Sequence, residues 1–158
     1  MKIFLILAMA IFSNMAAQAQ KNYIPLKEFQ GDTLKYMIVN FVENKERYIG
    51  QKVDSLLNDL EFEISTTFWP NGDIMDGNKM TGLRFSHLSH HQIRKISREG
   101  GGEYYVLFIR FAPPYIKAYS DWRKIGGAYW KKAYRDFVKE YIIKDIEIER
   151  IKISHFKG

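Results

Sequence analysis

Two stretches in the first third of the chain repeat apolar residues at the spacing of an α-helix. After Asp32 or Thr33, apolar side chains recur three and four positions apart as far as Asn44. A second stripe runs from Val53 to Leu60. Residues with this spacing share one face of a helix, and Asp and Thr are favoured N-cap residues. The pattern predicts two short amphipathic helices that pack on the same core.

Five later segments have the composition of β-strands. Glu61–Trp69 alternates polar and apolar residues, and Gly82–Leu88 resumes strand character. His91–Arg98 and Glu103–Ala112 flank a glycine-rich segment, which indicates a hairpin. Lys144–Ser154 alternates again and predicts a closing strand, with a slip in the alternation near residues 149 and 150. Residues 104–109 have no polar face, as expected for a central strand that is covered on both sides.

The segment between Pro113 and the closing strand predicts two more helices, separated by Gly126 and Gly127. The apolar residues at helical spacing are Tyr115, Ile116, Tyr119 and Trp122 in the first, and Trp130, Tyr134, Phe137, Val138 and Tyr141 in the second. Strands come in runs and do not alternate with helices one by one. This order predicts an α+β fold, an antiparallel sheet of four to five strands with helices packed on one face.

The N-terminus has the organisation of a secretory signal peptide. Lys2 precedes the apolar run Ile3–Phe12, and Ala17-Gln18-Ala19 follows with small residues where signal peptidase cleaves. The apolar run is too short to span a membrane. We therefore expect residues 1–19 to be a signal peptide and residues 20–158 to form one exported domain, periplasmic or secreted, without a transmembrane span. The alternative is a buried N-terminal helix.

Composition limits how this domain can be stabilised and what it can bind. The chain has 158 residues, no cysteine and a formal net charge of +6. Disulfides, thiolate metal sites and a lipid anchor on cysteine are therefore absent, and packing must supply the stability. The positive charge favours a protein or an acidic glycan as partner, and export disfavours nucleic acid. The alternative is that the excess lysine serves solubility.

Two segments resemble known exported proteins. Tyr48-Ile49-Gly50, leading into Val53–Leu60, is similar to the start of a group of small exported bacterial proteins of unassigned function, and residues 142–146 (IIKDI) resemble the other end of that pattern. More distantly, the pattern is similar to β-lactamase-inhibitor-like domains and outer-membrane assembly lipoprotein domains. Those families bind proteins. The resemblance implies an exported binding fold and supplies no catalytic residues.

Three histidines form the one cluster with metal-ligand chemistry: His87, His90 and His91. On a helix, His87 and His91 would share a face and could chelate zinc or copper. Candidates for a third ligand are Asp73, Asp76 and His155. The alternative is a solvated turn. Residues 71–78 are rich in Asn, Asp and Gly but lack the EF-hand spacing, so they predict a turn and not a calcium site. No cofactor is predicted.

Aromatic and basic side chains mix between residues 115 and 132, and this mixture is the candidate binding surface. The residues singled out are Tyr119, Trp122, Arg123, Lys124 and Tyr129. Aromatic faces stack on sugars and anchor protein interfaces, while cations at the rim select acidic partners. Trp122 lies next to the break at residues 126–127, and we expect its ring to be exposed.

Known catalytic sequence motifs are absent, including G-x-S-x-G, H-E-x-x-H and glycine-rich phosphate loops. The sequence therefore predicts an exported binding module that recognises a protein or an acidic glycan, and not an enzyme. The alternative is a small hydrolase that uses His87, His90 and His91, with or without a metal, together with Asp73. A structural protein of the cell envelope is a third possibility.

Signal cleavage after Ala19 can be tested by mass. We expect the intact mass of protein purified from the periplasm or the medium to correspond to a chain that begins at Gln20. A mass that retains Met1 would show that residues 1–19 are not removed.

Overall fold

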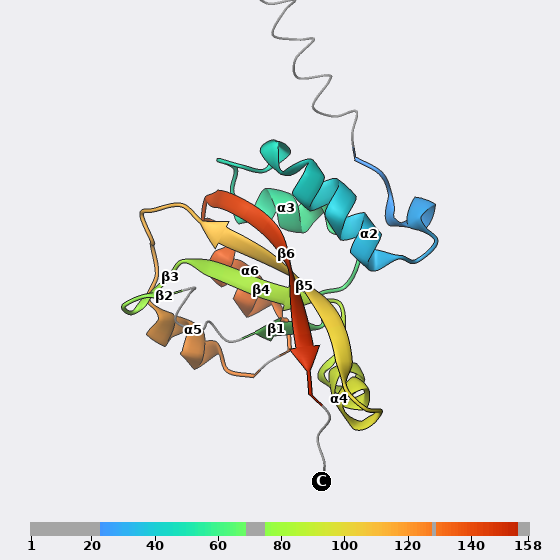
Figure 1. Ribbon diagram of the computed structural model, residues 1–158. Coiled ribbons are helices and arrows are strands. Elements are labelled where there is room, and N and C mark those ends of the chain that lie inside the picture. Colours follow the sequence, from blue (N-terminus) through green and yellow to red (C-terminus); the bar gives the residue numbers. More distant parts are fainter. Residues whose placement is uncertain (1–22, 69–74, 128, 155–158) are drawn as a thin grey trace, which may run out of the picture.

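The computed structural model describes residues 23–68, 75–127 and 129–154 (Figure 1). Its elements, in chain order, are η2 (Leu26–Phe29), α2 (Thr33–Met37), η3 (Ile38–Glu43), η4 (Lys45–Arg47), α3 (Val53–Asp59), β1 (Thr66–Phe68), β2 (Met75–Asp76), β3 (Lys79–Met80), β4 (Gly82–Ser86), α4 (His90–Arg98), β5 (Gly102–Phe111), α5 (Tyr119–Ile125), α6 (Lys132–Val138) and β6 (Ile143–Ile153). The predicted α+β fold is confirmed. Within these ranges, no helix is long and apolar enough to cross a membrane.

The main sheet has four antiparallel strands in the order β1-β4-β5-β6. β5 is central, and its ladder with β6 runs from the pair Gly102–Ile153 to the pair Arg110–Asp145. β2 and β3 form a separate two-stranded hairpin. The central position of the strand that lacks a polar face agrees with the expectation from sequence.

Both predicted N-terminal helices form. Asp32 is the N-cap of α2, and its carboxylate accepts a hydrogen bond of 2.9 Å from the Lys35 N–H. α2 continues directly into η3, a π-helical segment, so the helix ends near Asn44 as expected. In α3 the apolar stripe is buried through Val53, Leu56 and Leu57.

Helices cover one face of the sheet and enclose the core. Figure 1 shows α3 and α6 on the far side of β4 and β5, with α2 beyond the upper end. Aromatic rings fill much of the space: Phe111 stacks on Tyr141, with ring centroids 4.3 Å apart. The largest fully buried side chains are Tyr36, Tyr48, Tyr134, Tyr141, Phe41, Phe85, Phe108, Phe111, Met37, Leu56 and Met80.

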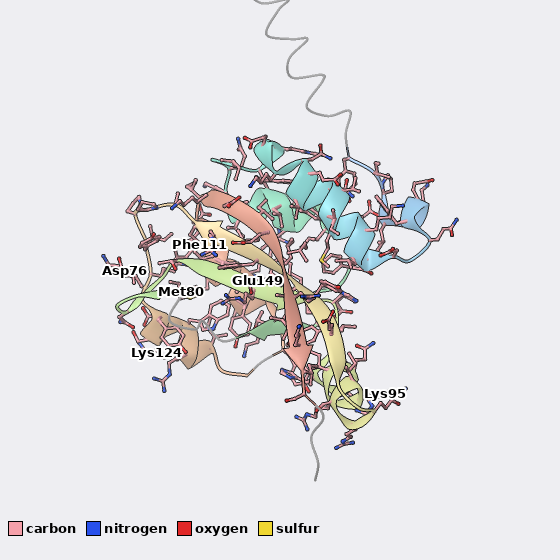
Figure 2. The ribbon with its side chains drawn as sticks, in the orientation of Figure 1. Asp76, Met80, Lys95, Phe111, Lys124 and Glu149 are labelled. Atoms are coloured by element: carbon pink, nitrogen blue, oxygen red, sulfur yellow. The ribbon has the colours of Figure 1, made fainter. Side chains whose placement is uncertain are left out.

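The second face of β5 is also covered. Phe108 is fully buried and lies between the guanidinium groups of Arg84 and Arg110, each 4.3 Å from its ring centre. The Nε of Arg84 donates to Glu149 and that of Arg110 to Glu147, both at 2.5 Å. Glu149 lies at the front of the sheet in Figure 2. Cation–π contacts and ion pairs therefore cover a ring that would otherwise face water.

Gly82 is required beneath this ring. A Cβ built at Gly82 would lie 2.6 Å from Cε2 of Phe108 and 2.8 Å from the carbonyl oxygen of Ile109. Only glycine lets strand β4 approach β5 so closely at this point.

The predicted strand His91–Arg98 is wrong, because these residues belong to helix α4. Ser89 and Gln92 form a capping box: the Ser89 side chain accepts from the Gln92 N–H, and the Gln92 side chain accepts from the Ser89 N–H. The S-x-x-Q pattern of residues 89–92 indicates the start of a helix. The glycines at residues 100–102 favour a hairpin instead, and the strand prediction depends on them. Those glycines end the helix, with φ of 111° at Gly100 and 86° at Gly101.

Two other strand predictions need correction. The strand expected from Glu61 is regular only from Thr66, because the Glu61 carboxylate accepts hydrogen bonds from the Tyr23 hydroxyl and the Leu26 N–H.

The pairing of β6 with β5 is continuous through residues 149 and 150, where the sequence predicts a slip. The irregularity in this ladder lies between Arg110 and Phe111. The expected loop before residue 80 contains the β2–β3 hairpin, and residues 70–73 lie outside the described ranges.

Replacing Leu57, which is 7% exposed, tests the core contact of α3. Leu57→Ala should lower the free energy of unfolding by about 2–5 kcal/mol, because it removes buried methyl groups and leaves a cavity. Urea titration followed by circular dichroism measures the loss. Ser55→Ala, on the exposed side of the same helix, should change stability by less than about 0.5 kcal/mol. Equal effects of the two variants would contradict the assigned face.

Candidate functional site

The clearest concentration of unpaired positive charge lies on α4. Side chains from this helix and one from the segment before α6 line a hollow of about 190 Å³. The lining residues are His90, His91, Arg94, Arg98 and Tyr129. We call this set the α4 surface.

Helix geometry brings these side chains together. His90, Arg94 and Arg98 are four residues apart, so they follow one another along one side of α4. Tyr129 reaches the same place because its backbone pairs with Thr66 at the edge of β1. The Tyr129 ring meets the edge of the His90 ring, with centroids 5.5 Å apart and planes at 86°.

Tyr129 is the most exposed large aromatic side chain in the described part of the molecule, at 63%. The His90 contact is edge-on, so it holds the tyrosine ring and leaves ring surface open to solvent. Tyr and Trp are enriched where proteins bind partners, because they give large contact area at low entropic cost. The ring is therefore placed to contact a bound molecule.

The guanidinium groups on the α4 surface have no partner among the residues that the structure describes. Within the described ranges neither Arg94 nor Arg98 makes an ion pair or a side-chain hydrogen bond, whereas Lys95 lies 3.8 Å from the carboxylate of Glu99. A guanidinium donates two parallel hydrogen bonds to a carboxylate, sulfate or phosphate. The α4 surface is thus chemically suited to an anion.

The structure divides the five residues expected to form one binding surface. Trp122 is only 3% exposed, so the expectation that its ring is exposed is wrong. Its ring packs 4.3 Å from that of Tyr134 and 5.5 Å from that of Phe137. The stripe that contains Trp122 turns inward because α5 must cover the apolar side of α6, which the sequence pattern alone did not show.

The other four residues of that set lie in three places, of which the α4 surface, with Tyr129, is the first. Tyr119 is half-buried and packs on the core. Arg123 and Lys124 are exposed and, with Ser120, line a separate open hollow of about 290 Å³. Lys124 pairs with Asp121 at 2.7 Å. Figure 2 shows Lys124 and Lys95 at opposite sides of the molecule, so the α5 cations do not belong to the α4 surface.

The three histidines do not converge. His87 precedes the helix, where its half-buried ring meets Phe62 edge-on at 5.9 Å. His90 contacts Tyr129, and His91 is exposed. His87 and His91 therefore do not share a helical face. No group of three metal-ligating side chains occurs among the described residues, which do not include Asp73 or His155.

The described residues likewise contain no catalytic pairing of these histidines. None of the three imidazoles donates to a carboxylate or accepts from a serine hydroxyl there. The buried Nδ1 of His87 and Nε2 of His90 have no hydrogen-bond partner. Asp73, the expected partner in a hydrolase, lies outside the described ranges.

A cluster of tyrosines near the N-terminus was not anticipated from sequence. The Tyr23 hydroxyl contacts that of Tyr36 at 2.8 Å and donates to the carbonyl of Asp59 at 2.6 Å. Tyr48 donates to the Asp59 carboxylate at 2.9 Å. Burial, more than these bonds, raises the pKa of Tyr23 and Tyr48. Each hydroxyl in the cluster is hydrogen-bonded, so the cluster ties residues 23–31 to the core.

Comparison with known proteins finds no match: no family model, no curated protein and no solved structure is similar to this chain.

Burial lowers the pKa of His87 below its ordinary value of 6.5. The unfolded chain therefore takes up the proton first, so this histidine should lower the free energy of unfolding as the pH falls below 6.5 toward the folded pKa. In His87→Gln, urea titrations at pH about 7.5 and about 5.5 should show a smaller loss of stability on acidification. His91→Gln is the exposed control and should behave as the wild type. An unchanged loss in His87→Gln would contradict the buried, neutral state.

Proposed function

We propose that this protein is an exported binding module that holds an anionic partner on the α4 surface. The observation that carries the proposal is that Arg94 and Arg98 follow one another along α4 with no counter-charge among the described residues, beside an exposed aromatic ring. The secretory signal pattern and the resemblance to exported binding domains support the exported setting.

Electrostatics favours this surface over the rest of the molecule. Most other cations near the sheet already have carboxylate partners, for example Lys45 with Asp145 and Lys52 with Glu140. A charge that is already paired gains little from a second anion, since the first must be displaced. The full chain has a net charge of +6, and removal of residues 1–19 takes away only the charge of Lys2. The remaining positive charge adds a long-range attraction that brings an anion to the surface and that salt weakens.

The ring of Tyr129 adds apolar contact to the charge. A purely ionic surface binds any anion weakly, because exposed ion pairs contribute less than about 1 kcal/mol each. An aromatic ring at the centre of such a surface supplies contact area from which water is excluded. The combination fits a polymer that has both anionic groups and apolar faces, such as an acidic glycan.

Binding to immobilised dextran sulfate, with uncharged dextran as reference, tests the proposal. The wild type should bind the sulfated polymer and lose affinity as NaCl rises from about 50 to about 300 mM. Arg94→Gln/Arg98→Gln should weaken binding about tenfold, a change of about 1.4 kcal/mol. Biolayer interferometry measures both effects.

The control removes the same charge from the other exposed site. Arg123→Gln/Lys124→Gln on α5 should weaken binding less than threefold. A larger effect of the α5 pair would place the site on α5, and equal effects would mean that net charge alone is responsible. Either result would contradict the α4 surface as the binding site.

A further inference from the structure

β6 forms one edge of the main sheet and is much longer than the strand at the other edge. It has 11 residues, while β1 at the opposite edge has 3. The outer side of β1 is already engaged, since Thr66 bridges to Tyr129 and the Trp130 N–H donates to the Ser65 carbonyl. Among the described residues, β5 is the one strand that pairs with β6 over most of its length.

The peptide groups of β6 that point away from the sheet can be identified. The Phe111 N–H donates to the Thr81 carbonyl at 2.7 Å. The N–H and carbonyl groups of the odd-numbered β5 residues therefore point to β4, and those of the even-numbered residues point to β6. The even-numbered residues of β5 pair with odd-numbered residues of β6, from Asp145 to Ile153. The even-numbered peptide groups of β6 therefore point outward, because directions alternate along a strand.

A second contact supports this assignment. The Ile146 N–H donates to the side chain of Asp145 at 2.9 Å, which requires that it point away from β5. The Asp145 carboxylate is itself held by Lys45 at 2.7 Å. At the start of β6, the Ile143 carbonyl accepts from the Gly50 N–H, and the Ile143 N–H donates to the Gln51 carbonyl. The first part of the β6 edge is therefore closed.

The remainder of the edge is open. The outward N–H and carbonyl groups of Ile148, Arg150 and Lys152 have no hydrogen-bond partner in the part of the chain that the structure describes. Arg150 and Lys152 are exposed, and Ile148 is half-buried. Figure 1 shows this end of β6 running down toward α4, where the Ser97 hydroxyl donates to the Ser154 carbonyl. Unpaired strand edges of this kind accept an additional strand.

The charges along β6 indicate which strand this edge accepts. Asp145, Glu147 and Glu149 all have cationic partners, and Arg150 lies 3.6 Å from Glu103. Lys144 and Lys152 make no ion pair with any described residue. The uncompensated charge of the strand is therefore positive at both ends.

A second copy of this chain fits the open edge poorly. In an antiparallel pair, the register that matches all the outward positions places Ile148 opposite Lys152 of the other copy. The uncompensated cation then faces an apolar side chain and gains no counter-charge, whereas an opposite charge directly across a ladder is stabilising. The edge is thus better suited to a segment of opposite charge than to itself.

We infer that β6 binds an extended acidic segment of a partner protein, which adds as a further strand along Ile148–Lys152. The backbone hydrogen bonds supply the pairing, and Lys152, which has no ion-pair partner among the described residues, selects acidic side chains. This site is separate from the α4 surface and does not depend on it.

Amide hydrogen exchange by NMR, with an acetylated (Thr-Glu)4 peptide as probe, tests the inference. In the free protein the amides of Ile148, Arg150 and Lys152 should exchange at least about tenfold faster than those of Glu147, Glu149 and Ile151. Saturating peptide should slow the first three about tenfold or more. A (Thr-Lys)4 peptide should give no protection.

Two further comparisons separate backbone pairing from charge. Arg150→Pro removes an outward N–H and should weaken peptide binding about tenfold, whereas Arg150→Ala keeps that N–H and should weaken it less than threefold. On the wild-type protein, (Thr-Glu)4 with N-methyl groups on alternate residues keeps its charges but loses strand hydrogen bonds. It should bind about tenfold more weakly, a result that does not require the proline variant to fold.

Three outcomes would overturn the inference. The first is that the peptide does not bind. The second is that it binds while the amides of Ile148, Arg150 and Lys152 exchange as before, because the peptide then lies elsewhere. The third is that these amides become protected without peptide as the protein concentration rises and sedimentation detects a dimer, because a second copy is then the occupant. Loss of dextran sulfate binding in Arg94→Gln/Arg98→Gln concerns the α4 surface alone.

Discussion

The fold depends on covering both faces of β5. Residues on one face, such as Leu107 and Ile109, and on the other, such as Val106 and Phe108, are fully buried. A strand that is apolar on both sides costs free energy wherever water reaches it. In a chain without cysteine, packing alone must provide the cover. The helices protect one face, while Arg84 and Arg110, each paired with a carboxylate, lie over Phe108 on the other.

The way the second face is covered decides which charges remain free. Arg84 and Arg110 lie over Phe108, and Glu149 and Glu147 are held in pairs with them. The carboxylates of β6 are thus used inside the fold, and Arg94 and Arg98 on α4 and the lysines at the ends of β6 have no ion-pair partner in the described part of the chain. Both proposed binding surfaces follow from this imbalance, one through side chains and the other through exposed peptide groups.

Local sequence signals predicted much of the fold, whereas tertiary contacts decided which residues form the candidate site. The N-cap Asp32, the buried stripe of α3 and the central position of β5 were predictable, since each depends on neighbours in the chain. Helix α4 was missed although Ser89 and Gln92 form a capping box, because the adjacent glycines were interpreted as a hairpin turn. Of the expected binding residues, Tyr129 lies on the α4 surface and Trp122 is in the core. Periodicity shows that a helix has an apolar side but not which neighbour covers it.

The sequence by itself determined the fold class, the two N-terminal amphipathic helices, the net positive charge and the absence of covalent cross-links. These properties are sums or short-range patterns, and they do not depend on how distant segments meet. The tertiary structure alone decided that, within the described ranges, Arg94 and Arg98 have no counter-charge, Tyr129 lies beside them and the β6 edge is open beyond Ile146. Each of these depends on partners far away in the chain, because a charge or a peptide group is free only when no distant segment folds back to meet it.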